Sequence, residues 1–129
     1  MLNKEFKFAI PGKSIPCVRT TQKQKWVSES YKKYQAYKSR VNTFLLGGML
    51  SYFQKAIKIT SDVSISCDFY ISGGVRGDLD NLVKGIFDSI QDSKTQSGII
   101  KNDKQVTELS ARIITCKKEE EKTEVIIQW

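Results

Sequence analysis

Residues 63–71, with the sequence VSISCDFYI, alternate without a break between two kinds of side chain. The odd-numbered positions from Val63 to Ile71 are all apolar, whereas serine, aspartate and tyrosine occupy the even-numbered positions. Successive side chains of a β-strand point to opposite faces of the sheet, so this pattern predicts a strand with one covered face. A chain that contains such a strand must supply other elements to cover the apolar face.

Helices that could cover this face are predicted on both sides of the strand. Residues 79–90 carry apolar side chains at intervals of three and four, which predicts an amphipathic helix. The same spacing from residue 28 to residue 55 predicts a long helix. Gly47 and Gly48 interrupt that second pattern, because glycine is a poor helix former, and either close packing against a neighbour or a kink would explain them.

Three further strands complete the predicted fold. Residues 4–10 alternate before a Pro-Gly turn, residues 98–116 contain a short apolar segment, a turn and a strand, and residues 123–129 form the last strand. The order β, α, β, α, β, β predicts an α+β (mixed α/β) fold in which two main helices pack on a mixed β-sheet. A length of 129 residues fits one domain, so we expect residues 1–129 to form a single domain.

Composition limits the chemistry that the chain can perform. It contains no histidine, and its three cysteines, at positions 17, 67 and 116, are too widely spaced for a C-x-x-C pair. A histidine general base and the usual zinc sites are therefore excluded, which leaves carboxylates, lysines or a bound metal ion. The first residues lack a signal-peptide pattern and no apolar run is long enough to cross a membrane, so we expect a cytoplasmic protein.

Positive charge is concentrated in the first half of the chain. Residues 1–58 contain 12 Lys and Arg against 2 acids, a net charge of +10, and residues 59–129 contain 9 against 12, a net charge of −3. A basic half of this kind is typical of a surface that binds a polyanion. Residues 19–40 interleave these cations with Trp26 and three tyrosines, which suits phosphate contacts and base stacking, although tyrosines packed on the core would give the same pattern.

Two aspartates, Asp78 and Asp80, stand at the start of the helix predicted for residues 79–90. Asp78 falls at the N-cap and Asp80 in the first turn, with Lys84 one turn later, so ordinary helix stabilisation would explain them. A functional site is the other explanation, because the pair follows a glycine turn and Asp103, at a later turn, could return beside the helix. Clustered carboxylates bind Mg²⁺ or Mn²⁺, and a metal held by acids on a basic protein suits a phosphodiester substrate.

These residues form part of a longer pattern. The segments GDLDNLVKGIFDSI and GIIKNDKQV resemble the D-x-D-N-x-x-K … D-D-x-Q pattern of the RusA family of Holliday junction resolvases, crossover junction endodeoxyribonucleases of bacteria and their phages. The opening FAIPGKSIPCVR also resembles that family's first strand and proline-rich turn, so the similarity spans most of the chain. Two positions depart from the pattern: Asn102 replaces the first acid of the D-D pair, and Gly77 stands where some members have arginine.

The resemblance implies a RusA-like fold and a Mg²⁺-dependent endonuclease, with Mn²⁺ as the other candidate metal, that resolves four-way DNA junctions by paired symmetric nicks in recombination and repair. It assigns Asp78, Asp80 and Asp103 as catalytic, metal-binding acids and Lys84 as the catalytic lysine. Asn81 would support the turn or the ligands beside it. The resemblance also implies a homodimer with one active site per subunit, in the cytoplasm of a bacterium or a phage-infected host.

Other basic and acidic residues are expected to have simpler roles. Arg19, Lys23, Lys25 and Arg76 are the candidates for DNA contacts, which would be made to phosphates and carry little sequence information. Asp88 and Asp92, further along the chain, are expected to be surface acids.

Two other functions remain open at this point. The first is a branched-DNA-binding protein without catalytic activity, in which the paired aspartates only cap a helix. The second is a metal-dependent nuclease that uses the same acids on flaps or replication forks.

Overall fold

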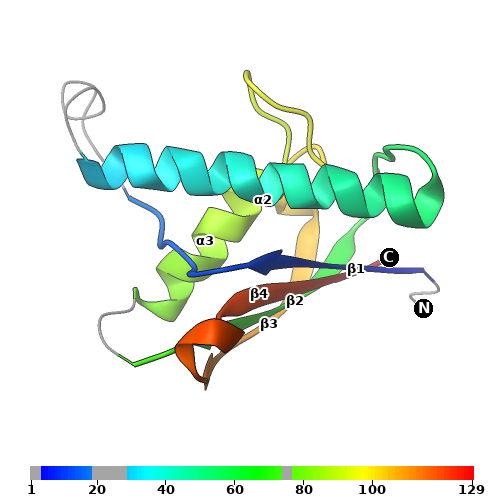
Figure 1. Ribbon diagram of the computed structural model, residues 1–129. Helices are drawn as coiled ribbons and strands as arrows, with labels where there is room; N and C mark the ends of the chain where they lie inside the picture. Colours follow the sequence, from blue (N-terminus) through cyan, green and yellow to red (C-terminus); the bar gives the residue numbers. More distant parts are fainter. Residues whose placement is uncertain (1–3, 19–28, 74–76) are drawn as a thin grey trace.

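The computed structural model describes residues 4–18, 29–73 and 77–129. Its elements, in chain order, are β1 (Glu5–Pro11), α2 (Glu29–Phe53), β2 (Val63–Ile71), α3 (Leu79–Ile90), the 3-10 helix η1 (Asp103–Gln105), β3 (Val106–Thr115), the 3-10 helix η2 (Lys118–Glu120) and β4 (Lys122–Gln128). The predicted order of strands and α-helices is therefore confirmed, and the chain forms one α+β domain (Figure 1).

The four strands form one mixed sheet in the order β1-β4-β2-β3. β4 lies between β1 and β2 and is antiparallel to both, whereas β3 is parallel to β2 at the sheet's other edge. Parallel neighbours cannot be joined by a tight turn, and α3 supplies the long crossover between them. Both ends of α3 are consequently fixed by the sheet, which gives the helix a defined place beside it.

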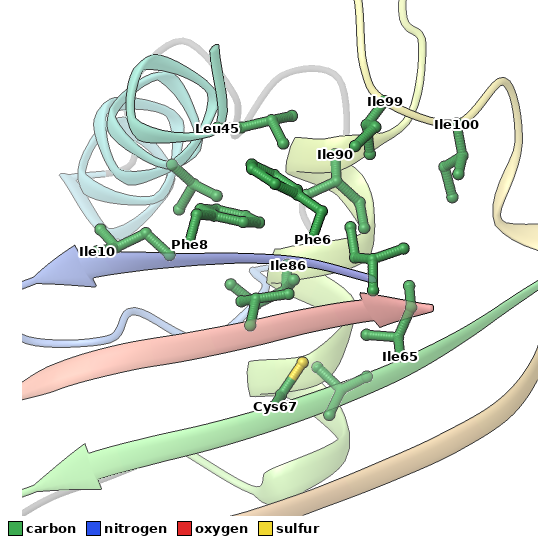
Figure 2. Close-up of a cluster of buried hydrophobic side chains, with 14 of the residues drawn as sticks. Phe6, Phe8, Ile10, Leu45, Ile65, Cys67, Ile86, Ile90, Ile99 and Ile100 are labelled. Carbon is green, nitrogen blue, oxygen red and sulfur yellow. The ribbon is translucent and has the colours of Figure 1, made fainter. Parts of the chain in front are cut away.

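The buried apolar side chains of β1, β2 and β4 face one side of the sheet, and both helices cover that side (Figure 1). Along β2 every second residue from Val63 to Ile71 is buried, as the alternation predicts. The side chains of Phe6 and Phe8 from β1 meet Leu45 of α2 in the same cluster that contains Ile86 of α3 (Figure 2). The core thus ties α2 and α3 to the sheet through shared side chains.

Close packing explains one of the two adjacent glycines in α2, Gly48. A Cβ atom on Gly48 would lie 3.0 Å from Phe6 Cζ and 3.3 Å from Phe8 Cβ, so the helix approaches β1 closely at this residue. A Cβ atom on Gly47 would meet nothing within 4 Å among the described atoms. Close packing therefore explains Gly48, and the helix continues through both glycines to Phe53.

Two of the three tyrosines that sequence analysis left open, Tyr34 and Tyr37, belong to the core, whereas Tyr31 in the first turn of α2 is half-buried. Tyr34 and Tyr37 are only 2% and 5% exposed, so neither ring is available for base stacking. Trp26 lies outside the described residues. Neither α2 nor any other helix in the described parts of the chain combines the length and apolar character needed to cross a membrane.

Candidate active site

Asp78 occupies the N-cap position of α3, as predicted, but it does not cap the helix with its side chain. Its backbone is extended, with φ −67° and ψ 147°, and its carboxylate makes no capping hydrogen bond. An N-cap aspartate normally accepts a hydrogen bond from an amide of the first turn. Because Asp78 is exposed and its carboxylate is not used in this way, helix capping does not explain the residue.

The first turn of α3 is fixed through Asp80 and Asn81. The exposed Asp80 carboxylate accepts a hydrogen bond from the Asn81 amide, with 2.9 Å between Oδ1 and N. The Asn81 carbonyl oxygen accepts a hydrogen bond from the Cys17 amide at 2.9 Å. The segment that follows β1 is thereby attached to the start of α3, close to both aspartates.

Lys84 is the point at which α3 meets Asp103. The Lys84 Nζ atom lies 3.2 Å from Asp88 Oδ1 and 3.5 Å from Asp103 Oδ2. The Asp103 amide donates a hydrogen bond to Gln91 Oε1, at the C-cap of α3, over 3.0 Å. Asp103 therefore returns beside α3, but against the middle and the C-terminal end of the helix rather than beside Asp78 and Asp80.

The surroundings of Lys84 keep its side chain protonated. Partial burial by itself lowers the pKa of Lys84, but the hydrogen bond and charge of Asp88, together with the charge of Asp103, outweigh it and raise the pKa above its ordinary value. The Lys84 side chain is still 39% exposed, so a substrate can approach it. The site thus presents a permanent positive charge between two carboxylates.

The donor chemistry of Asp78, Asp80 and Asp103 fits Mg²⁺, since all three offer hard carboxylate oxygens. Within residues 4–18, 29–73 and 77–129, however, no three acidic, cysteine or histidine side chains lie close enough together to form a metal site. Two of the predicted ligands stand at the start of α3, and the third is paired with Lys84.

Asp88 is a residue of this site that sequence analysis missed. It was expected to be a surface acid, but its side chain is only 24% exposed, and it accepts a hydrogen bond from the Tyr34 hydroxyl at 2.8 Å as well as contacting Lys84. The spacing of Asp80, Lys84 and Asp88 at intervals of four places them on one helix face, and this was the available signal. Asp92 is exposed, as expected, and pairs with Lys58.

The two departures from the RusA pattern both have structural explanations. Asn102 is the N-cap of η1, where its side chain accepts a hydrogen bond from the Lys104 amide at 2.8 Å. A Cβ atom on Gly77 would lie 2.4 Å from Pro16 Cβ, so no larger residue fits without moving the segment after β1.

The predicted DNA-binding residues Arg19, Lys23, Lys25 and Arg76 lie outside the described residues. The described part of the basic half contains a shallow groove of about 340 Å³, lined by Lys13, Ile15, Lys33, Ala36, Tyr37 and Arg40. The Ile15 carbonyl oxygen also lies 3.3 Å from where a Cβ atom on Gly85 would be, so the groove adjoins α3. Three cations are therefore gathered next to the helix that carries the acids.

Fold and site together define a class of protein: a small α+β domain in which acids and a lysine lie along one helix beside a basic groove, a charge arrangement suited to a polyanion such as DNA. The family model of endodeoxyribonuclease RusA matches residues 9–128. The chain belongs to the RusA endodeoxyribonuclease family and is therefore a nuclease. No curated protein sequence matches it significantly.

Proposed function

We propose that this nuclease resolves four-way DNA junctions by paired symmetric nicks, in a reaction that depends on Mg²⁺. The observation that carries the proposal is the family match, which extends over residues 9–128 and includes Asp78, Asp80, Lys84 and Asp103. Two related nicks require two active sites, so the active form is a homodimer. Its place of action is the cytoplasm of a bacterium or a phage-infected host, where branched DNA arises.

Asp78, Asp80 and Asp103 would hold the metal, with Mg²⁺ as the first candidate and Mn²⁺ as the second. The exposed carboxylate of Asp78, which the helix does not use as a cap, supports this assignment. A bound divalent cation would activate a water molecule as the nucleophile and would neutralise charge on the scissile phosphate, without need of a histidine.

Lys84 binds the scissile phosphate as a point charge. Its side chain is partly exposed and its pKa is raised, so it remains cationic when DNA arrives. A fixed cation next to the reacting phosphate stabilises the negative charge that develops there in the transition state. Asn81 helps to hold the first turn of α3 through its backbone contact with Cys17.

The basic groove grips the DNA backbone, and we expect binding to weaken steeply with salt. Three cations in each of two subunits would give a slope of log affinity against log salt of about −5, since each neutralised phosphate releases about 0.9 counterion. Electrophoretic mobility shifts between 50 and 200 mM salt, without divalent metal, measure this slope. Combined Lys13→Ala, Lys33→Ala and Arg40→Ala substitutions should make the slope shallower. Lys117→Ala with Lys118→Ala on η2 should not, and a slope near zero for the unmodified protein would exclude phosphate-dominated binding.

The family match argues against a non-catalytic junction-binding protein, so the second candidate is a nuclease that uses the same acids on flaps or replication forks. One assay separates the two functions: a labelled synthetic four-way junction is incubated with the protein and Mg²⁺, beside linear duplex, flap and fork substrates, and the strands are resolved on a denaturing gel. Symmetric nicks near the crossover support the proposal. Preferential cutting of flaps or forks supports the second candidate, and binding without nicks on any substrate would contradict both.

A further inference from the structure

We infer that Asp88 is a positioning residue, which holds the Lys84 ammonium group at the active site and is itself held by Tyr34 of α2. This inference rests on the proposed function, because it assigns Asp88 a role through the lysine that binds the scissile phosphate.

Both carboxylate oxygens of Asp88 have partners. Asp88 Oδ1 faces Lys84 Nζ at 3.2 Å and the Gln91 side-chain amide at 3.5 Å. Asp88 Oδ2 accepts the hydroxyl hydrogen of Tyr34 at 2.8 Å, and the Cys17 thiol lies 3.9 Å from the same oxygen. A carboxylate held from several directions has little freedom to rotate, so its Oδ1 atom stays directed at Lys84.

Tyr34 is a rigid support for this carboxylate. Its side chain is 2% exposed, and burial, with further contributions from Cys17 and Asp88, raises its pKa. The phenol therefore stays protonated and donates to Asp88. A buried hydroxyl that lost its acceptor would leave an unpaired polar group, so Tyr34 and Asp88 fix each other.

Asp88 and Asp103 are joined by two routes, which together form a closed ring. One route passes through Lys84, which contacts both carboxylates. The other passes through Gln91, whose amide nitrogen donates to Asp88 Oδ1 and whose amide oxygen accepts from the Asp103 backbone amide at 3.0 Å. The ring thus fixes the positions of Lys84 and Asp103, the two residues in it that the family pattern assigns to the active site.

Removal of the Asp88 charge changes where Lys84 lies. Of the two carboxylates that hold the ammonium group, only Asp103 would remain, and a lysine on a flexible stem moves toward its remaining counterion. The Lys84 ammonium group would then move away from the position at which it binds the phosphate and would pair with the Asp103 carboxylate alone. The consequence is a slower cleavage step with little change in DNA binding.

The test compares Asp88→Asn and Tyr34→Phe with two matched controls. Asp92→Asn also removes the acid of a lysine pair, but outside the ring, and Tyr52→Phe also removes a tyrosine hydroxyl from α2, at a side chain that is 64% exposed and lies outside both the ring and the basic groove. Single-turnover cleavage of the junction should fall about 10–100-fold in Asp88→Asn and about 3–10-fold in Tyr34→Phe, the range found when a supporting partner of a site residue is removed. Junction affinity without metal, and both controls, should change less than about twofold.

Two further readouts separate positioning from a merely structural role. In a Lys84→Met background, Asp88→Asn should slow cleavage by less than about twofold more, because its effect passes through the lysine. On the metal-free protein, ¹H–¹⁵N NMR should show a protected Lys84 ammonium signal, identified by its loss in Lys84→Met and weakened in Asp88→Asn and Tyr34→Phe.

The possible results have distinct meanings. Three results would each overturn the inference. The first is a wild-type cleavage rate in both Asp88→Asn and Tyr34→Phe. The second is an equally large further loss of cleavage rate when Asp88→Asn is added to Lys84→Met, and the third is a Lys84 ammonium signal that neither variant changes. If the unmodified protein cuts no junction, the proposed function fails, and the NMR signal still decides whether Asp88 positions Lys84. Tyr34→Phe keeps the Asp88 carboxylate, so its cleavage rate and ammonium signal test the inference if Asp88→Asn does not fold.

Discussion

Asp80→Asn is expected to abolish junction cleavage while leaving the fold intact and junction binding at least as tight as in the unmodified protein. The amide oxygen of asparagine can still accept the hydrogen bond that Asp80 receives from the Asn81 backbone, so the first turn of α3 keeps its geometry. Only the negative charge is lost, together with its favourable interaction with the helix N-terminus, worth about 0.3–1 kcal/mol. Stability should therefore change little.

The chemical step should be affected far more strongly. A neutral amide is a poor ligand for Mg²⁺ compared with a carboxylate, and loss of one preorganised group that acts on the reacting phosphate slows reactions by about 100-fold or more. Single-turnover cleavage of a four-way junction measures the rate, and mobility shifts in the absence of metal measure the binding.

Asp62→Asn is the matched control for this substitution. Asp62 is an exposed acid just before β2 and belongs to neither α3 nor η1, so its variant should cleave at the unmodified rate. Near wild-type cleavage by a folded Asp80→Asn protein would remove Asp80 from the catalytic residues and return it to helix stabilisation.

Ile86→Ala is expected to cause a large loss of stability. Ile86 is 0% exposed and points from α3 into the cluster of side chains between the helices and the sheet (Figure 2). Truncation of a buried isoleucine to alanine lowers the free energy of unfolding by about 2–5 kcal/mol, because it removes apolar contacts and leaves a cavity. A domain of this size has only about 5–15 kcal/mol in total, so cleavage at elevated temperature should also be lost.

Urea unfolding followed by tryptophan fluorescence measures the change. Leu50→Ala is the control, because Leu50 is 50% exposed on α2 and its truncation should alter stability by about 0.5 kcal/mol or less. Equal losses in the two variants would mean that Ile86 does not occupy the core position that the structure gives it.

The elements of the fold could be predicted because each has a clear period in the sequence. The alternation in residues 63–71 required a strand with one covered face, and the intervals of three and four in residues 79–90 required an amphipathic helix. Sheet order was beyond reach, since no local pattern reveals that β4 inserts between β1 and β2. The close approach at Gly48 was anticipated as one of two explanations, but its partner Phe6 could not be named.

The candidate site was predictable where it depends on helix spacing and hidden where it depends on packing. The positions of Asp78 and Asp80 on α3 follow from the phase of the apolar stripe. The partner of Asp88 could not be found in this way, because Tyr34 is 54 residues away along the chain and is brought near only when α2 packs against α3. The same packing makes Asp88 a half-buried residue rather than a surface acid.

The position of β4 in the sheet has a consequence for synthesis of the protein. β1 and β2 are made first, but they are not neighbours, because β4 must enter between them and pair with both. A growing chain on the ribosome therefore cannot assemble this sheet until β4 has been translated. The order of the strands thus makes completion of the sheet a late event in the synthesis of this domain.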